Sequence, residues 1–395
     1  MNGANPEGRF CEAEGEGCRC TLCPHRCFIR PGGSGLCAVR RLNRAYPGPP
    51  AKAALELPYY GCITALAEDP IEKKPLFHWR PGSGILSAGF AGCNLRCPFC
   101  QNWRISQISP ADGGAAPVPP VSGRRLSPEA LAALAADSPS GGAQIAYTYS
   151  EPLVHAEYLL ACMEAARQRG IANVLVTNGC VNLKAAGEIL ALTDAANIDL
   201  KSFSEETYDR VLGGSLPAAL DFIRLAVSLG VHVEITTLVT PGLNDGDAEL
   251  EEAARFIADL SGEIPWTLAG GNGVPGAEKR GPSIPWHLSA CHPDWNWNGP
   301  PTNPARLLAA VERARTILPH VYTGNIPGEP EDTSCPHCGA VLVKRRGYQV
   351  DASGLGEPLP SGTRDAAFGG GPAGGNRRAL FYRCAACWGT TPIRA

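Results

Sequence analysis

The chain has 395 residues, of which 44% are apolar and 18% charged, and its formal net charge is −3. This length predicts one large domain with appendages or two to three smaller domains, and the apolar content is enough for a sizeable buried core. The slightly negative charge gives no basic surface of the kind that binds phosphate backbones, which argues against nucleic acid as a partner.

The sequence has neither the pattern of a membrane protein nor that of a secreted one. It contains no run of about eighteen apolar residues. Residues 1–8 have neither a basic start nor an apolar segment, so we see no secretory signal and expect a cytoplasmic protein without a membrane partner. Clustered cysteines in a reducing compartment bind metal more often than they form disulfides. Eleven of the 17 cysteines fall into three clusters, which predicts metal binding.

The first cluster consists of four cysteines spaced as C-x2-C-x3-C-x9-C, namely Cys20, Cys23, Cys27 and Cys37. The surrounding segment holds too few apolar side chains to form a core, so we expect it to fold around a metal. Its spacing matches neither the usual zinc pattern nor the ferredoxin pattern, and zinc and a second iron–sulfur cluster stay open as alternatives. A third alternative is free thiols on a loose tail.

Residues 38–83 lead into the main part of the chain. Within them the stretch Asp69–Phe77 is polar, and its charge run, residues 72–74, is typical of a solvated face on composition alone. From residue 85 onward, apolar strand-like runs alternate with alanine- and leucine-rich helical segments. The predicted strands are Ile85–Phe90, Gln144–Thr148, Asn173–Val176, Ala195–Leu200, Val231–Val239, Ile284–Leu288 and His320–Gly324.

The helical segments between these strands have recognisable starts. Ser127 is a good N-cap, followed by Pro128 at the first helical position. Further helices are expected to begin near Pro152, Asn182, Ser204, Asp245 and Asn303. Alternating strands and helices predict βα units on a parallel sheet, and thus an α/β fold with an incomplete parallel (β/α) barrel. In such barrels the chemistry lies on the loops after the carboxyl ends of the strands.

The second cluster lies on such a loop. Cys93, Cys97 and Cys100 follow the first predicted strand with C-x3-C-x2-C spacing. Three close thiolates can hold one compact metal centre, and a [4Fe–4S] cube bound by three cysteines keeps one iron open for a ligand that is not protein. The alternatives are a zinc knuckle with one ligand missing and three unrelated buried thiols.

Two C-x2-C hooks close the chain and predict a zinc ribbon, a closed four-thiolate site whose role is structural. Their cysteines are Cys335, Cys338, Cys384 and Cys387. The hooks are further apart than usual, because the low-complexity stretch 351–378, expected to be mobile, lies between them. A glycine-rich stretch at 269–283 is expected to be an inserted loop.

These observations divide the chain into three parts. Residues 1–68 are the N-terminal cysteine-rich segment with its lead-in, residues 69–330 are the partial barrel, and residues 331–395 are a zinc-ribbon-like segment with a disordered insert. The chemistry is expected in the central part, with metal-binding segments at both ends.

The second cluster, with Phe99 directly before its last cysteine, resembles the signature of the radical S-adenosylmethionine (SAM) superfamily. Further stretches resemble the pyruvate formate-lyase activating enzyme branch of that superfamily and, more closely, the radical SAM component of the AmmeMemoRadiSam system. The resemblance extends from about Cys20 to Cys338. Its stretches are 20–27, 69–75, 93–103, 146–152, 174–179, 197–201, 236–245, 285–293 and 324–328.

The resemblance implies roles for several residues. The three cysteines of the second cluster would hold a [4Fe–4S] cluster, whose open iron is chelated by SAM. Glu151 stands at the place of the family's Gly-Gly-Glu motif, which binds the SAM amino group. Tyr149 and Ser150 stand where the family has its two glycines.

Three further positions match motifs that contact SAM in the activating enzymes. Asp199 and Lys201 match an Asp-Leu-Lys motif, and His287 matches a Pro-Tyr-His motif. The residues alone also allow a helix N-terminal carboxylate at Glu151, an ordinary ion pair between Asp199 and Lys201, and a satisfied core histidine at His287. Weaker candidates in comparable loops are Asn102, Asn178, Asn244 and His292.

The function implied by the resemblance is reductive cleavage of SAM to a 5′-deoxyadenosyl radical, which takes a hydrogen atom from an unknown small-molecule or protein substrate. An electron donor such as flavodoxin or ferredoxin would be a partner. One alternative is an activase of a glycyl-radical enzyme. Another is a non-catalytic, metal-stapled scaffold that binds protein or nucleic acid, for which the basic runs 344–346 and 377–378 give slight support.

Overall fold

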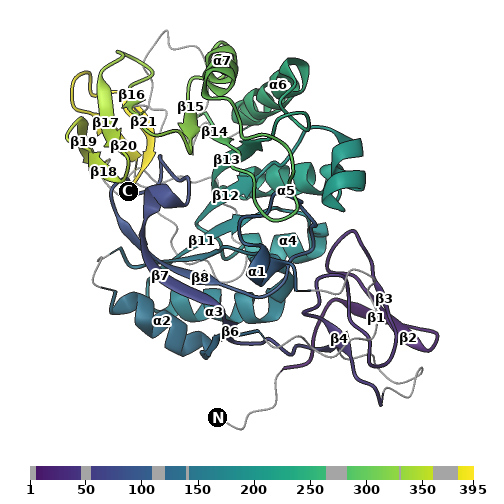
Figure 1. Ribbon diagram of the computed structural model, residues 1–395. Coiled ribbons are helices and arrows are strands. Elements are labelled where there is room, and N and C mark those ends of the chain that lie inside the picture. Colours follow the sequence, from purple (N-terminus) through teal and green to yellow (C-terminus); the bar gives the residue numbers. More distant parts are fainter. Residues whose placement is uncertain are drawn as a thin grey trace.

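A computed structural model describes residues 6–45, 55–108, 121–138, 142–263, 283–328, 331–358 and 381–395. Its centre is an eight-stranded sheet in which seven strands run parallel, each beside the next one along the chain (Figure 1). The parallel strands are β8 (Gly84–Gly89), β10 (Gln144–Thr148), β11 (Ala172–Thr177), β12 (Ala195–Asp199), β13 (His232–Val239), β14 (Trp286–Ala290) and β15 (Val321–Gly324). They correspond to the seven strands predicted from the sequence.

The eighth strand, β7 (Ala65–Pro70), pairs antiparallel with β8 at one edge of the sheet. β15 forms the other edge, and the described strands do not close the sheet into a full barrel. The prediction of an incomplete parallel barrel of α/β type is therefore confirmed. The sequence did not indicate β7, because its residues Ala-Leu-Ala-Glu-Asp-Pro are only partly apolar.

Helices connect consecutive parallel strands and cover one face of the sheet (Figure 1). They are α2 (Pro128–Ala136), α3 (Ala156–Gln168), α4 (Leu183–Leu190), α5 (Leu216–Ser228), α6 (Asp247–Glu263) and α7 (Pro304–Arg315). The side chain of Ser127 accepts a hydrogen bond from the Ala130 N–H, and that of Asn303 accepts one from the Ala305 N–H. Both predicted helix starts are confirmed, each with proline in the first turn.

The segment after β12 becomes helical at Glu205, which agrees with the helix start expected near Ser204. This helical segment continues only as a short π-helix (Thr207–Leu212), and a separate helix, α5, follows it. The break lies at two glycines, the first of which, Gly213, has a left-handed φ of 61°. Ser215 then caps α5 by accepting from the Ala218 N–H.

The two faces of the sheet pack against different partners, because side chains alternate along each strand. Leu86 and Ala88 of β8 belong to the large core under the helices. Ile85 belongs to a smaller cluster on the opposite face, where Leu76 and Trp79 from the loop after β7 also pack. This loop therefore covers the second face near the amino ends of the parallel strands.

The charge run at residues 72–74 lies in this loop, and its prediction as a solvated face holds for Lys73 but is wrong for the other two residues. Glu72 and Lys74 are only 5% and 2% exposed. Lys73 and Lys74 each donate to Asp69 at 2.7 Å, and the Gly82 N–H donates to Glu72 at 2.8 Å. Composition could not indicate this burial, because the compensating groups come from the neighbouring strand and turn.

Small sheets flank the central one at both ends of the chain (Figure 1). The N-terminal strands are β1 (Cys11–Glu14), β2 (Gly17–Cys20), β3 (Phe28–Ile29), β4 (Arg41–Leu42), β5 (Leu55–Glu56) and β6 (Cys62–Ile63), the last paired with β9 (Arg124–Arg125). The C-terminal strands are β16 (Thr333–Ser334), β17 (Val341–Arg346), β18 (Gln349–Asp351), β19 (Leu355–Pro358), β20 (Phe381–Cys384) and β21 (Thr390–Arg394).

The C-terminal strands are attached to the loop after β7. The Arg80 N–H donates to the Arg394 carbonyl at 2.9 Å, and the Arg394 N–H donates to the His78 carbonyl at 2.8 Å. Arg345 is fully buried, donates to the Phe77 carbonyl at 2.6 Å and stacks on the Phe77 ring. The basic run 344–346 is therefore partly structural, which weakens its reading as a nucleic-acid surface.

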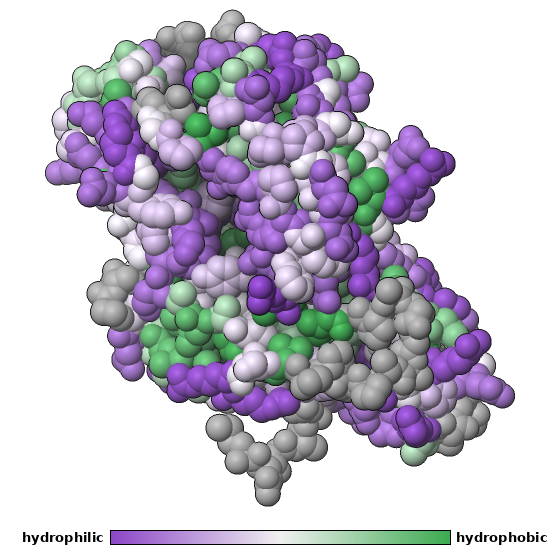
Figure 2. Space-filling view, viewed as in Figure 1, coloured by the Kyte–Doolittle hydropathy of each residue, from purple (hydrophilic) through white to green (hydrophobic). Residues whose placement is uncertain are grey.

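Several predictions fall outside the described residues, namely most of the inserted loop at 269–283, the basic pair at 377–378 and much of the stretch at 351–378. Residues 355–358 are described and form β19, so that part of the stretch was wrongly predicted as mobile. Among the described helices, none combines the length and apolar character needed to cross a bilayer. Figure 2 shows largely hydrophilic side chains on one face, with a hollow near the middle of the view.

Candidate functional site

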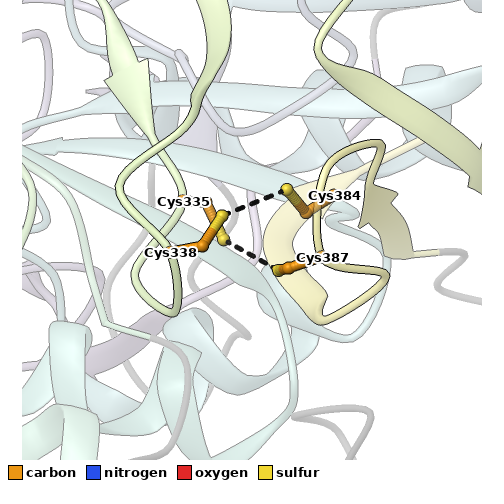
Figure 3. A group of neighbouring side chains, drawn as sticks. All are labelled: Cys335, Cys338, Cys384 and Cys387. Carbon is orange, nitrogen blue, oxygen red and sulfur yellow. Dashed lines mark hydrogen bonds between the residues drawn. The ribbon is translucent and has the colours of Figure 1, made fainter.

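The four C-terminal cysteines come together at the spacing of a single-metal site (Figure 3). Their sulfur atoms all lie within 4.8 Å of one another. The sulfurs of Cys335 and Cys387 are 3.8 Å apart, and those of Cys338 and Cys384 are 3.7 Å apart. Four thiolates around one tetrahedral zinc ion, with Zn–S bonds of about 2.3 Å, would be separated by about 3.8 Å. The geometry therefore fits a closed metal site.

The loop after β8 carries the second cysteine cluster at the carboxyl edge of the sheet. Its turn begins at Gly92, which has a φ of 81° and donates its N–H to the Ile105 carbonyl at 2.7 Å. The Cys93 sulfur accepts from the Leu95 N–H at 3.3 Å, and the Cys100 sulfur lies 3.2 Å from the Ser106 hydroxyl. Polar neighbours of this kind favour thiolates as ligands.

The three sulfurs of this loop are spread more widely than the C-terminal four. Burial raises the pKa of the Cys93 thiol, and so do Cys97 and Cys100 among its neighbours. In the described part of the chain, only the C-terminal four bring three or more metal-ligating atoms within 4.8 Å of one another. Thiolates bound to different irons of one cube are held apart by the cube, so this wider spread fits a polynuclear cluster.

Glu151 follows β10 and lies beside the cysteine loop. Its carboxylate accepts hydrogen bonds from the Thr177 hydroxyl at 2.7 Å, the Asn178 N–H at 2.8 Å and the Leu153 N–H at 3.0 Å. The side chain is almost fully buried, which raises its pKa to about 7, although the three hydrogen bonds lower it. None of the described basic side chains forms an ion pair with it. Glu151 is thus both a helix N-terminal carboxylate and a buried acceptor suited to a cationic ligand.

The turn before Glu151 is held by a network that the sequence did not indicate. Tyr149 has a φ of 68°, a left-handed conformation that is an outlier for an aromatic residue. Its hydroxyl donates to Asp69 at 2.6 Å, and the Lys74 ammonium lies 4.5 Å from the centre of its ring. The backbone therefore keeps a glycine-like turn at a position where the related motif has glycine. The match at residues 69–75 was the only sequence signal for these partners.

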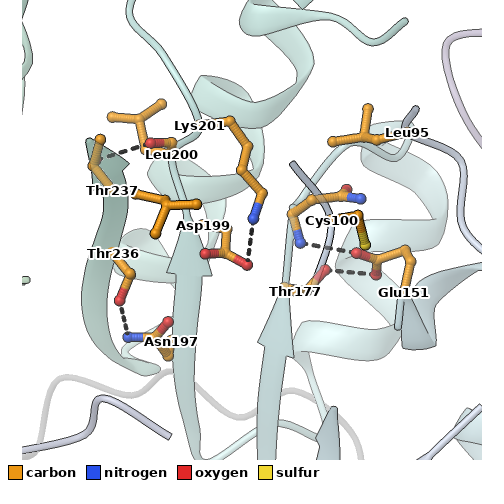
Figure 4. Close-up of polar contacts among 12 residues, drawn as sticks. Leu95, Cys100, Glu151, Thr177, Asn197, Asp199, Leu200, Lys201, Thr236 and Thr237 are labelled. Carbon is orange, nitrogen blue, oxygen red and sulfur yellow. Dashed lines mark hydrogen bonds and ion pairs between the residues drawn. The ribbon is translucent and has the colours of Figure 1, made fainter. Parts of the chain in front are cut away.

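Asp199 and Lys201 lie at the carboxyl end of β12 and form an ion pair of 2.9 Å. Burial lowers the pKa of Lys201, but Asp199 and the Cys97 and Cys100 thiols outweigh it and raise the pKa above its usual range. Figure 4 shows the pair at the same end of neighbouring strands as Glu151 and Cys100. The structure therefore brings the second cysteine cluster, Glu151, Asp199 and Lys201 together at one edge of the sheet.

His287 lies apart from this group. It is 2% exposed on β14, and its Nε2 is 2.8 Å from a carboxylate oxygen of Glu234. The same carboxylate accepts from the N–H groups of Phe77 and His78 and is bonded to His232. Its placement matches the alternative of a satisfied core histidine, and its contact with SAM stays a prediction.

The weaker candidates occupy different positions. Asn178 joins the site, because its side-chain amide donates to the Cys93 sulfur at 3.7 Å. Asn244 is buried and donates to the Lys201 carbonyl at 2.6 Å, so it supports the turn after β12. Asn102 precedes the short helix α1 (Trp103–Ser106) without a side-chain cap, and His292 is exposed.

The N-terminal cysteines lie close to this site. Cys20 and Cys23 are buried, whereas Cys27 and Cys37 are half-buried. The Cys20 N–H donates to the Cys27 carbonyl at 2.9 Å, and the Leu36 N–H lies 3.5 Å from the Cys27 sulfur. The four residues are thus folded together against the central sheet, with no disulfide among them.

Comparisons with known proteins agree with this arrangement. The model of the radical SAM superfamily matches residues 89–257. A protein of Methanocaldococcus jannaschii described as uncharacterized is 35% identical over 335 residues, which cover 83% of this chain and 87% of that protein. Pyruvate formate-lyase 1-activating enzyme of Escherichia coli K12 is 28% identical over 173 residues, which cover 43% of this chain and 67% of the enzyme.

Among solved structures, a radical SAM methyltransferase from Sphaerobacter thermophilus aligns with 62% of this chain and 66% of its own, at 15% identity and a TM-score of 0.43. The extended match to the archaeal protein and the family match across the cysteine loop do not depend on that distant likeness. Residues 89–257 therefore form a domain of the radical SAM superfamily, and the chain is homologous to pyruvate formate-lyase activating enzymes.

Proposed function

We propose that this chain is a radical SAM enzyme whose site lies at the carboxyl edge of the central sheet. The observation that carries the proposal is Glu151, a buried carboxylate without a described cationic partner, placed beside the cysteine loop at residues 93–100. When bound, a [4Fe–4S] cluster and SAM would together supply a 5′-deoxyadenosyl radical that abstracts a hydrogen atom from the substrate.

Each residue of the site would have its own role in binding the cluster, SAM or the substrate. Cys93, Cys97 and Cys100 would hold three irons and keep the fourth open for the amino and carboxylate groups of SAM. Glu151 would accept from the SAM ammonium, because a charged donor is what its buried carboxylate lacks. Asp199 and Lys201 would line the rim and orient the carboxylate or ribose of SAM, or the substrate. His287 would act through the buried network around Glu234 or, as the resemblance implies, contact SAM.

The proposal also covers the substrate, the electron donor and the C-terminal metal. The substrate is left open, and membership of the AmmeMemoRadiSam system rests on the motifs quoted above. Activation of a glycyl-radical enzyme is the second candidate, supported by the likeness to pyruvate formate-lyase 1-activating enzyme. The proposal includes a one-electron donor such as flavodoxin or ferredoxin and a reducing, cytoplasmic setting, in which cysteine thiols stay available as metal ligands. We assign zinc to Cys335, Cys338, Cys384 and Cys387.

The test is reductive cleavage of SAM by the anaerobically prepared enzyme. With dithionite as reductant, the wild type should convert SAM to methionine and 5′-deoxyadenosine, faster when cell extract supplies the substrate. Cys97→Ala should lose this product together with the SAM-responsive [4Fe–4S] signal in electron paramagnetic resonance. A cluster-replete wild type that yields no 5′-deoxyadenosine under either condition would refute the proposal in favour of the metal-stapled scaffold.

A further inference from the structure

The four N-terminal cysteines form a compact group that the proposed reaction does not use. Cys20 and Cys23 are buried and Cys27 and Cys37 are half-buried within one folded segment. The Cys20 N–H donates to the Cys27 carbonyl and the Leu36 N–H to the Cys27 sulfur, so the segment that carries Cys37 folds back onto the turn at residues 23–27. The group therefore has the ligand number of a complete metal centre.

The spread of the sulfurs distinguishes between zinc and an iron–sulfur cluster. The C-terminal four have sulfurs 3.7 and 3.8 Å apart, as on a single ion. In the described residues no three of the N-terminal four sulfurs lie within 4.8 Å of one another, and the same holds for the loop at residues 93–100. The first three N-terminal cysteines also have the x2 and x3 spacings of that loop in reverse order. The N-terminal group therefore resembles the cluster loop and differs from the single-ion site.

The two cysteine segments touch through their backbones. A β-carbon on Gly92 would lie 2.4 Å from the Cys37 carbonyl oxygen, so no side chain can separate the segments there. The His25 Nε2 lies 2.7 Å from the Asn94 carbonyl oxygen, close enough for an N–H to donate. Each of these four residues is one of the cysteines or lies within two positions of one. Arg96 also donates to the Leu36 carbonyl at 3.1 Å, so two metal centres held this way would be joined by two hydrogen bonds and by packed backbone.

We propose that Cys20, Cys23, Cys27 and Cys37 bind a second [4Fe–4S] cluster that relays single electrons to the cluster on the loop at residues 93–100. The relay rests on the proposed function. A low-potential one-electron donor, such as reduced flavodoxin, would reduce the N-terminal centre by one electron, and that electron would then reduce the central cluster. No bond forms or breaks and no proton moves in this step. His25 is a positioning residue that joins the two segments.

Metal content of the full-length, anaerobically reconstituted wild type tests the cluster first. We expect about eight irons and about eight sulfides per chain, as two four-iron cubes require, with about one zinc. About four irons with about two zincs, or four irons with an N-terminal site that holds no metal, would overturn the inference. This measurement is independent of catalysis, so it stands even if the enzyme fails to cleave SAM.

The double variant Cys23→Ser/Cys27→Ser tests the relay. Its iron content should fall by about four per chain while the SAM-responsive signal of the central cluster remains. The rate of 5′-deoxyadenosine formation with reduced flavodoxin, divided by the rate with dithionite, should fall by at least about tenfold, since only the small reductant can reach the central cluster directly. Cys11→Ser, at a half-buried cysteine of the same segment, is the matched control and should change neither quantity.

An unchanged iron content in the double variant would overturn the cluster assignment, and an unchanged ratio of rates would overturn the relay. Should the double variant not fold, His25→Phe keeps all four cysteines and removes the hydrogen bond to Asn94. It should keep the full metal content and slow reduction of the central cluster by flavodoxin in stopped-flow absorbance, with reduction by dithionite as its internal reference. Equal slowing with both reductants would contradict a relay.

Discussion

At the scale of single residues, Glu151 is arranged as a receptor for a positive charge. Three neutral donors bind its carboxylate, but burial still raises its pKa to about 7. These hydrogen bonds therefore stabilise the ionised carboxylate only in part. An ammonium group brought by a ligand would complete the neutralisation. Because the donors come from β11 and from the turn after Glu151 itself, the receptor exists before the ligand arrives.

Glu151→Gln should therefore weaken SAM binding without loss of iron. Losing a charge-assisted hydrogen bond costs about 1.5–3 kcal/mol, or about one to two powers of ten in affinity. Equilibrium dialysis with labelled SAM measures the affinity, and iron analysis measures the cluster. Glu129→Gln, at the exposed first turn of α2, is the control. Wild-type affinity in Glu151→Gln would remove this residue from the SAM site.

Tyr149 gives a second residue-scale prediction, because it holds a strained turn in place. The left-handed conformation costs a non-glycine residue about 1–2 kcal/mol, and the bond to Asp69 offsets it here. Tyr149→Ala loses that bond and keeps the strain, whereas Tyr149→Gly loses both. The alanine variant should thus be less stable than the glycine variant by about 1 kcal/mol in urea unfolding, and it should bind SAM more weakly.

The usual order is the reverse, since alanine stabilises a helix relative to glycine by about 1 kcal/mol. Lys184, exposed on α4, is the matched control, and there Lys184→Ala should be more stable than Lys184→Gly. If Tyr149→Ala proved as stable as Tyr149→Gly, the idea that Tyr149 holds this turn in a strained conformation would be wrong.

The sequence was enough to identify those site residues whose motifs span only a few neighbouring positions. The cysteine spacing, Glu151 after a strand and the Asp199–Lys201 pair are readable within a few residues. The bond between Tyr149 and Asp69 spans 80 positions, and the burial of Glu234 depends on N–H groups more than 150 positions away. A short sequence motif cannot indicate such long-range contacts, although these contacts determine which charged side chains are buried.

At the scale of elements, apolar runs were sufficient to place the seven parallel strands, since strands covered on both faces are mostly apolar. β7 and α5 were missed for different reasons. β7 is an edge strand with charged residues near its end, and α5 begins only two residues after a pair of glycines that interrupts the helical segment. Edge position and helix interruptions are settled by tertiary contacts, which a propensity pattern does not contain.

An element-scale prediction concerns the C-terminal strands, which four thiolates would hold together. Cys338→Ser should lower zinc by about one per chain and leave iron unchanged, because the hook is remote from the cluster loop. Hydrogen exchange should then rise in β17, β20 and β21, whose described cluster contains few other buried side chains. Cys291→Ala, a buried cysteine outside the clusters, is the control. Unchanged zinc in Cys338→Ser would contradict a four-cysteine site.

At the scale of the whole molecule, the two ends of the sheet have different chemistry. The carboxyl edge carries the cysteine loop, Glu151 and the Asp199–Lys201 pair. Near the amino edge, the Glu234 carboxylate holds the loop after β7 against the sheet, and the C-terminal strands pack on that loop. The N-terminal cysteine segment lies beside the carboxyl edge, whereas the C-terminal segment packs at the opposite end, so the two cysteine segments lie at different ends of one sheet.

The amino end of the sheet, which the loop after β7 and the C-terminal strands cover and which we call the closed end, contains buried neutral histidines. This predicts loss of stability in acid. Burial lowers the pKa of His320 to about 4, only partly opposed by Glu234, and burial lowers the pKa of its ring neighbour His78 as well. Below about pH 6.5 His320 is protonated in the unfolded chain, but in the folded chain it stays neutral down to about pH 4. The free energy of unfolding therefore falls as the pH falls from about 6.5 to about 4, and it is constant above this window. For His320 alone, the loss between about pH 7.5 and about pH 5.5 is about 1.4 kcal/mol.

His320→Phe keeps the aromatic contact with His78 and removes one of these protons. Anaerobic urea unfolding, followed by circular dichroism at the two pH values, should show a smaller acid loss in His320→Phe than in the wild type, by about 1 kcal/mol. The exposed His292 provides the control, and His292→Phe should lose as much stability as the wild type. An equal acid loss in His320→Phe and wild type would mean that His320 is already charged in the folded protein, and the closed end would then not be held by neutral histidines.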